Sequence, residues 1–302
     1  MGASEGRMPK RRGHAASLGH DARGEHPATG HGRSRALRTA SPEPARDSAT
    51  RRNPVGGVRN VSRPALLIDI APPPPFTGHA ADVLLLPGRA AFLPASATLL
   101  VADLHLGKAA TFRNAGIPVP EGSAQADLAR LERLVCDTAA KRLMVLGDLF
   151  HARSGCTPTV FDEFAATRAR FPTTEVILIA GNHDRAVGKI PPSLGIDSCL
   201  RTHDEPPFHF VHEPATELPE PGRTCFTIAG HLHPTVTIRS PSGDRITERC
   251  FVAEAATLVL PAFGSFTGGH RMTHADGLRL WIARDDGVAD VTRLAALSAK
   301  AK

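Results

Sequence analysis

Residues 176–185 read VILIAGNHDR, in which five apolar residues run directly into a glycine, an amide, an imidazole and a carboxylate. A short apolar run rich in β-branched residues is typical of a strand buried on both faces, and such strands belong to parallel α/β sheets. The ligands and catalytic groups of these sheets gather beyond the carboxyl ends of the strands. The stretch therefore predicts an α/β fold with a functional site where this strand ends.

The sequence before this stretch repeats the pattern of strand and helix. Apolar runs at 97–102 and 143–146 predict two more buried strands. Amphipathic periodicity predicts helices over 123–141 and 158–171, one after each of these strands. Strands that alternate with helices predict a parallel α/β core.

The second half of the chain has a different pattern. From about residue 208 the apolar runs become short and closely spaced, and turn sequences such as SPSGD separate them. The final run, VADVTRL at 288–294, is interpreted as a strand as well. This half is therefore predicted to be mostly β, with antiparallel pairs.

The N-terminal region differs in composition from everything that follows. Residues 1–60 are rich in Arg, Gly, Ala, Ser, Pro and His and lack aliphatic periodicity, which predicts disorder. Residues 1–64 hold 13 Lys and Arg against 5 Asp and Glu, whereas the rest holds 23 against 25. The four prolines at 72–75 predict a stiff linker. We expect a basic tail over 1–76, either a solvated extension or an arm for nucleic acid, and one folded domain over 77–302.

The cysteines and the hydropathy bound the cellular setting. Five cysteines lie far apart and form no CxxC pair, which argues against a disulfide framework and against a cysteine zinc site. A reducing cytoplasm is the expected location. No stretch approaches the roughly 20 apolar residues of a membrane span, so membrane insertion is not expected.

Every apolar strand of the core ends in metal-binding side chains. In chain order these side chains are Asp103 and His105, Asp148, Asn182 with His183 and Asp184, His212, and His231 with His233. Oxygen and nitrogen donors of this kind suit Mn²⁺, Fe or Zn²⁺, and their number is enough for two ions. Side-chain alternation on an extended segment predicts that Asp103 and His105 face one site together. His209, three residues before His212, is expected to lie elsewhere.

The blocks DxH, GD, GNHD, a lone His and GHxH occur here in that order, and this order resembles the calcineurin-like metallophosphoesterases over residues 83–270. The flanking sequences LHLGKAATFRNAGIPVP, LGDLFHAR and LPAFGSFTGG are similar to the ligase-associated metallophosphoesterase family (PdeM), which is linked to the bacterial DNA-damage response. The resemblance implies a four-layer αββα sandwich with two mixed sheets. One departure is His151, which stands where many members of the superfamily have an aspartate.

The resemblance also implies roles for the residues at the strand ends. One ion would be held by Asp103, His105 and His233, the other by Asn182, His212 and His231, and Asp148 would bridge them. Two divalent ions are expected, with Mn²⁺ preferred and Fe or Zn as alternatives. A hydroxide between the ions would attack phosphorus in line.

Other residues near these blocks are expected to act on the substrate. His183 would protonate the leaving oxygen. Asp184 would either orient His183 or cap the following turn. Arg113 and Arg185 are candidate contacts for the substrate phosphate. Gly264, Gly268 and Gly269 would form a loop at the rim of the site or a pair of turns.

The resulting prediction is a dinuclear phosphodiesterase, acting on DNA in a repair context with DNA ligase and helicase repair proteins as partners by family association. A small-molecule phosphomonoesterase or a cyclic-nucleotide phosphodiesterase would use the same metals. A non-catalytic interaction module is the third alternative. Against DNA, the folded part is slightly acidic and the sequence displays no basic stripe or aromatic platform.

Overall fold

The computed structural model describes residues 65–70, 81–119, 122–215, 226–239, 242–272, 275 and 277–300. The predicted disordered segment 1–60 and the linker at 72–75 lie outside these residues and stay predictions. Leu66–Ile70 form strand β1, which pairs antiparallel with the next strand, β2 (Ala81–Leu86). The assignment of these five residues to the tail was therefore wrong.

The first sheet contains seven strands in sequence order, and its two halves differ in direction. Its other strands are β3 (Ala90–Leu93), β4 (Thr98–Val101), β5 (Arg142–Leu146), β6 (Glu175–Ile179) and β7 (Ser198–Leu200). The pairs from β1 to β4 are antiparallel and those from β4 to β7 are parallel. The parallel part confirms the α/β core predicted around VILIA, and the carboxyl ends of β4, β5 and β6 lie at one edge.

The second sheet contains nine strands and is also mixed. Its strands are β8 (Thr202–Glu205), β9 (Phe208–Val211), β10 (Phe226–Ala229), β11 (Pro234–Arg239), β12 (Arg245–Glu254), β13 (Thr257–Val259), β14 (His270–Arg271), β15 (Arg279–Ala283) and β16 (Val288–Asp290). Antiparallel pairs prevail, as predicted, but β10 is parallel to both of its neighbours, β9 and β13. The carboxyl ends of β9 and β10 therefore point the same way.

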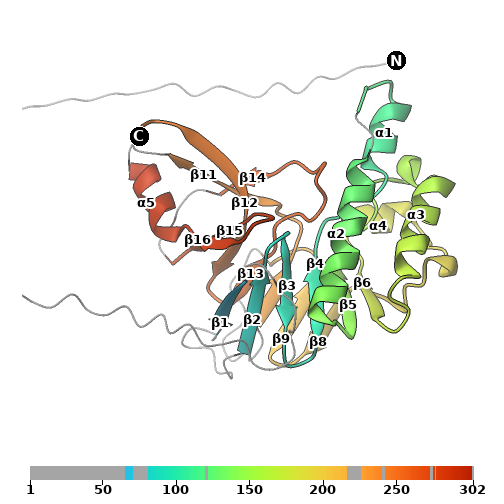
Figure 1. Cartoon of the computed structure of the whole chain (residues 1–302), viewed down its shortest axis with the longest axis horizontal. Coiled ribbons are helices and arrows are strands. Elements are labelled where there is room, and N and C mark those ends of the chain that lie inside the picture. The colour runs from blue at the N-terminus through green and yellow to red at the C-terminus, as the bar shows by residue number, and fades with distance from the viewer. Residues whose placement is uncertain are drawn as a thin grey trace, which may run out of the picture. The chain divides into compact units, whose positions relative to one another are not determined.

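Helices α2 and α3 cover the outer face of the first sheet, and α5 covers that of the second (Figure 1). The structure describes five α-helices. They are α1 (Lys108–Asn114), α2 (Ser123–Thr138), α3 (Pro158–Arg168), α4 (Asn182–Val187) and α5 (Thr292–Lys300), with short 3-10 turns at Arg153–Gly155 and Pro192–Leu194. The helices α2 and α3 confirm the two helices that the periodicity predicted. No helix among the described residues is long and apolar enough to span a membrane.

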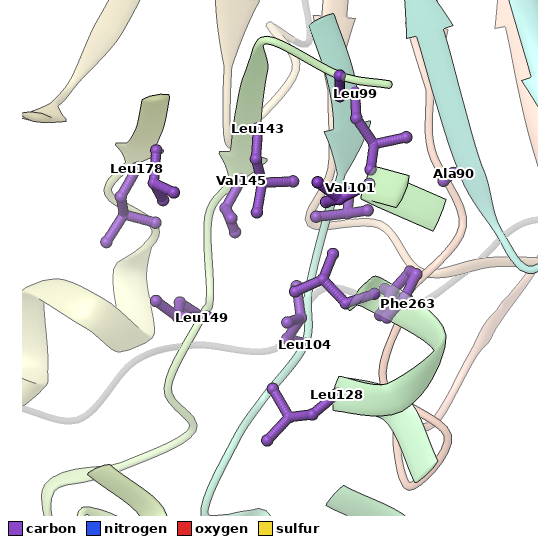
Figure 2. Close-up of a cluster of buried hydrophobic side chains, with 14 of the residues drawn as sticks. Ala90, Leu99, Val101, Leu104, Leu128, Leu143, Val145, Leu149, Leu178 and Phe263 are labelled. Atoms are coloured by element: carbon purple, nitrogen blue, oxygen red, sulfur yellow. The ribbon is translucent and has the colours of Figure 1, made fainter. Parts of the chain in front are cut away.

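Three clusters of buried apolar side chains define four layers. The first lies between the sheets and includes Trp281 and Phe251 of the second sheet with Leu100 of the first. The second lies between the first sheet and helices α2 and α3, and Figure 2 shows part of it, with Leu143 on a strand and Leu128 on α2. The third lies between the second sheet and α5. This order of layers confirms the αββα sandwich with two mixed sheets.

The C-terminal strand is shorter than predicted. The run at 288–294 alternates like a strand, but β16 ends at Asp290 and α5 begins at Thr292. The Asp290 carboxylate accepts a hydrogen bond from the Thr292 N–H at 2.9 Å. A carboxylate in this position satisfies an amide that a helix start leaves unpaired, and this favours the helix over a longer strand.

Candidate metal centre

The predicted ligands come from five strand ends that meet at one place. Asp103 and His105 follow β4, Asp148 follows β5, Asn182 begins α4 after β6, His212 follows β9, and His231 and His233 follow β10. The histidines and carboxylates among them fall into two groups, and within each group the ligand atoms lie within 4.8 Å of one another. The two sheets therefore each contribute one side of the site.

The first group contains Asp103, His105, Asp148 and His233. His105 Nε2 lies 3.2 Å from His233 Nε2, and His233 Nε2 lies 3.2 Å from Asp103 Oδ1. The Oδ2 atom of Asp148 is 3.9 Å from His105 Nε2. Two imidazole nitrogens and two carboxylates thus lie close enough together to hold one cation.

The second group contains Asp148, His212 and His231, and Asn182 lies beside it. His212 Nε2 is 3.0 Å from Asn182 Oδ1, 3.2 Å from His231 Nδ1 and 3.4 Å from Asp148 Oδ2. Asp148 therefore belongs to both groups through the same oxygen, Oδ2. A carboxylate shared between two donor groups is the arrangement that a bridged pair of cations requires.

A main-chain oxygen on the side away from the metal centre holds the ring of His212 in one orientation. Its Nδ1 lies 3.0 Å from the main-chain oxygen of Leu146, which can only accept, so Nδ1 carries the proton and Nε2 presents a lone pair to the centre. Gly147 makes this possible, because a Cβ at that position would lie 2.0 Å from His212 Nδ1. Gly147 also has φ of +81°, which favours glycine.

The pKa values of His105 and Asp148 favour the forms that bind cations. Burial is the largest effect on His105 and lowers the pKa of this imidazole to about 3, although the charge of Asp148 raises it. Burial raises the pKa of Asp148, but the hydrogen bond and charge of His212 outweigh it and leave the pKa below its usual value. Neutral imidazole and ionised carboxylate are the forms that bind metal. Burial lowers the pKa of His212, but the hydrogen bond and charge of Asp148 leave it above its usual value in the absence of a cation.

Five of the proposed ligands have a left-handed backbone. Their φ values are 57° for Asp103, 51° for His105, 50° for Asp148, 70° for His231 and 47° for His233. The structure does bring Asp103 and His105 together, but the reason given by the sequence analysis, alternation along an extended segment, was wrong. A left-handed residue other than glycine costs about 1–2 kcal/mol, and such residues cluster at functional sites.

One buried atom shows that the donor set fits a cation. Asp103 is fully buried, and its Oδ1 has no hydrogen-bond partner among the described residues, whereas Oδ2 accepts from the His231 N–H at 2.9 Å. A buried carboxylate oxygen without a partner is unfavourable. A divalent cation among Asp103, His105 and His233 would satisfy it, and oxygen and nitrogen donors suit Mn²⁺, Fe and Zn²⁺.

His183 lies at the edge of both groups. Its main-chain N–H donates to Asp148 Oδ1 at 2.9 Å, and its ring Nε2 is 3.9 Å from Asp148 Oδ2. The ring Nδ1 is hydrogen-bonded to the main-chain oxygen of His151. Because that oxygen accepts the Nδ1 proton, Nε2 is the nitrogen that faces the centre.

Asp184 does not orient His183. Its carboxylate is buried and accepts the N–H groups of Phe150 and Gly181, both at 3.0 Å. Burial raises the pKa of Asp184, although these backbone hydrogen bonds lower it. Of the two roles left open by the sequence analysis, the contacts are those of the cap on α4, and the orienting role belongs to the His151 carbonyl.

His151 is a member of the site that the sequence analysis did not assign. Its Nδ1 lies 3.4 Å from Nδ1 of His105, and its ring stacks on His183 with centroids 4.9 Å apart. Burial, together with the charge of Lys108, lowers the pKa of His151 to about 4. The signal was present in the sequence as the departure from the aspartate of the superfamily.

The other predicted residues lie farther out. Arg185 is exposed and forms an ion pair with Glu213 at 3.0 Å. Arg113 is exposed on α1 and lines a cavity that also contacts His105. His209 pairs with Asp204 at 2.5 Å, as expected for a residue that is not at the centre.

Comparisons with known proteins agree with this geometry. Residues 97–250 match the family model described as calcineurin-like phosphoesterase. The crystal structure of the nuclease MPE of Pseudomonas putida is 35% identical, with a TM-score of 0.59, and the match covers 72% of this chain and 96% of that chain. A protein of unknown function from Aquifex aeolicus, AQ665, is 19% identical with a TM-score of 0.30, over 45% of this chain and 78% of that chain. Comparison with curated proteins gives no significant match.

The family match spans half of the chain, and it includes every residue of the two donor groups. The proposed ligand Asn182 lies within it as well. The chain therefore belongs to the calcineurin-like phosphoesterases and is a metal-dependent phosphoric ester hydrolase.

Proposed function

We propose that the protein hydrolyses phosphodiester bonds in DNA with two divalent metal ions, in vivo Mn²⁺. The observation that carries this proposal is the position of Asp148 Oδ2 in both donor groups. The likeness to the nuclease of Pseudomonas putida supports a phosphodiester substrate. A cytoplasmic role in repair, with ligase and helicase proteins as partners, rests on the resemblance of the flanking sequences alone.

The ligands divide between the ions as the resemblance implies. Asp103, His105 and His233 would hold one ion, Asn182, His212 and His231 the other, and Asp148 both. Bound in this way, the two ions supply a nucleophile at neutral pH and stabilise the charge that develops on the phosphoryl oxygens.

The protein's own groups then supply the proton for the leaving oxygen. The His151 carbonyl holds the Nδ1 proton of His183, so that Nε2 faces the reacting phosphate. As an imidazolium, His183 donates the Nε2 proton to the alkoxide that leaves, and the ring returns to the neutral state. Asp148 Oδ2 lies 3.9 Å from Nε2 and holds the ring beside the centre during the transfer.

The proposal is tested by turnover of matched substrates. Mn²⁺-loaded protein is assayed with an aryl phosphodiester, its aryl phosphomonoester, and single-stranded and duplex DNA. We expect turnover of the diester and of DNA, and loss of this turnover on chelation. Hydrolysis confined to the monoester or to a cyclic nucleotide would replace DNA with a small substrate, and absence of all turnover would leave the non-catalytic module.

A pair of variants distinguishes the loss of the shared Asp148 carboxylate from the general effect of removing one negative charge. Asp148→Asn should lose both metal ions and all turnover. Asp204→Asn removes an exposed carboxylate from the other sheet and should keep both. Metal content by elemental analysis, after reconstitution with Mn²⁺, Fe²⁺ or Zn²⁺ in turn, identifies the preferred ion. Two ions retained in Asp148→Asn would contradict the bridging role.

A further inference from the structure

A cavity of about 460 Å³ adjoins the metal centre. It lies between α1, α2, α3 and the loop Gly264–Gly269. His105 lines it, and so do Phe266 and Thr267 of that loop. A substrate bound at the metal centre could therefore extend directly into this cavity.

Phe266 adds an exposed aromatic ring to the lining of the cavity. It is 39% exposed, and it is the one aromatic ring among the exposed large hydrophobic side chains of the described residues. Its ring lies 5.6 Å from that of Phe112, Phe112 stacks on His151 at 6.5 Å, and His151 stacks on His183 at 4.9 Å. The four rings thus form a row from Phe266 to His183 at the metal centre, although the sequence displayed no aromatic platform.

Hydrogen bonds hold the residues before and after Phe266 in place. Ser265 donates its N–H to Asp127 Oδ2 at 2.6 Å. Arg249 donates to the main-chain oxygens of Ser265 at 2.9 Å and of Thr267 at 2.7 Å. A stacking face that is already held in place loses little conformational entropy when a ligand binds.

The unpaired charges in the cavity are positive on balance. Lys108 is half-buried there, Arg113 is exposed beside it, and neither has a carboxylate within ion-pair distance among the described residues. Of the two carboxylates that line the same cavity, Asp127 forms an ion pair with Arg130 at 2.8 Å. Glu163 accepts a hydrogen bond from the neutral amide of Gln125 at 2.6 Å and keeps its charge, so two unpaired cations stand against one carboxylate. An anion such as a phosphate is the complementary ligand.

We propose that this cavity binds the nucleotide next to the scissile phosphate, whose base stacks on Phe266 while a neighbouring phosphate contacts Lys108. The proposal rests on the proposed phosphodiesterase function and names a binding site for its substrate. Stacking of a base on an aromatic side chain corresponds to roughly a tenfold change in affinity. Since stacking does not depend on which base is present, the subsite tolerates any sequence.

The first test compares esters with and without a nucleoside. Methyl 4-nitrophenyl phosphate and the 3′- and 5′-(4-nitrophenyl phosphate) esters of thymidine present the same leaving group. Phe266→Ala should raise KM about tenfold for at least one thymidine ester, with kcat nearly constant, and should leave the methyl ester unchanged. Phe266→Trp should restore KM, and Phe266→Leu should not. Ile246→Ala, an exposed apolar side chain on β12, serves as the control.

The second test measures binding and needs no turnover. A labelled oligothymidylate and an abasic oligomer of equal length are bound to metal-loaded protein in a His183→Ala background, which suppresses cleavage. Phe266→Ala should weaken only the oligomer that has bases. Lys108→Gln should weaken both and reduce the dependence of affinity on salt, whereas Lys189→Gln, an exposed control, should not.

The outcomes separate the two proposals. If the parent protein hydrolyses no diester but Phe266→Ala still weakens the oligothymidylate selectively, the proposed function fails and the subsite remains. If the esters are hydrolysed and Phe266→Ala affects all three equally or not at all, the subsite is refuted. An equal effect on the abasic oligomer would likewise refute stacking.

Discussion

We expect Gly147→Ala to weaken metal binding strongly, and Gly277→Ala provides a closely matched control. Both glycines have a left-handed backbone, with φ of +81° and +84°. A Cβ at Gly147 would lie 2.0 Å from Nδ1 and 2.3 Å from Cγ of His212, whereas nothing lies within 4 Å of a Cβ at Gly277. The two substitutions therefore share the backbone penalty and differ in the collision with a proposed ligand.

The structure gives the size of the effect. The left-handed backbone costs each alanine about 1–2 kcal/mol of stability. Because ordinary contact begins at 3.4 Å, the His212 ring must move by about 1.4 Å in Gly147→Ala. Overpacking of this kind costs about 1–3 kcal/mol more. The movement also breaks the contact with the Leu146 carbonyl that orients His212, and loss of such a contact weakens metal binding about 10–100-fold.

The assay is urea unfolding of both variants with Mn²⁺ and with chelator. At a metal concentration of about 100 times Kd, the metal should stabilise the parent and Gly277→Ala by about 2.7 kcal/mol. A site weakened 100-fold would retain less than about 0.5 kcal/mol of this increment. If Mn²⁺ stabilised Gly147→Ala as much as Gly277→Ala, the reasoning from the His212 contact would be refuted.

Three further predictions concern separate parts of the molecule. His183→Ala should keep the metal content of the parent and lose most turnover, whereas Asp148→Ala should lose metal; equal metal loss in both would contradict the assigned roles. Asp127→Ala leaves the buried guanidinium of Arg130 unpaired and should destabilise the fold by about 3–5 kcal/mol in urea unfolding, so a loss below about 1 kcal/mol would count against this ion pair. Burial raises the pKa of Cys250 from 9.0 to about 12, so above pH 9.0 only the unfolded state loses the thiol proton. Stability should then fall by about 1.4 kcal/mol per pH unit up to the folded pKa, and Cys250→Ala should remove that part of the decline.

The sequence predicted the parallel core and the strand-end ligands for one physical reason. A strand buried on both faces must be apolar throughout, so the first polar residue after it marks the edge of the sheet. In a parallel sheet these edges coincide, and side chains as distant in sequence as Asp103 and Asp148 meet there. Gly147 is visible in the sequence, but only the structure shows that its missing Cβ makes room for His212.

Other features depend on contacts that no local pattern encodes. The run Leu66–Ile70 is apolar, but whether it pairs as an edge strand depends on β2, and the prolines that follow it suggested a linker. Asp184 could bond to a neighbouring imidazole or to backbone amides, and the nearby Phe150 N–H decided between them. The row from Phe266 to His183 joins rings that lie far apart in sequence, so its presence could not be predicted.

The left-handed backbone at five proposed ligands has an evolutionary consequence. Glycine at Asp103, His105, Asp148, His231 or His233 would relieve about 1–2 kcal/mol at each position and would remove the ligand. A lineage released from its chemistry would drift toward glycine and gain thermal stability as it lost activity. A descendant that kept only the sandwich should therefore be recognisable by glycines at these five positions and by a higher melting temperature. This chain has aspartate or histidine at all five positions, so it keeps the ligands and has a lower stability than such a descendant.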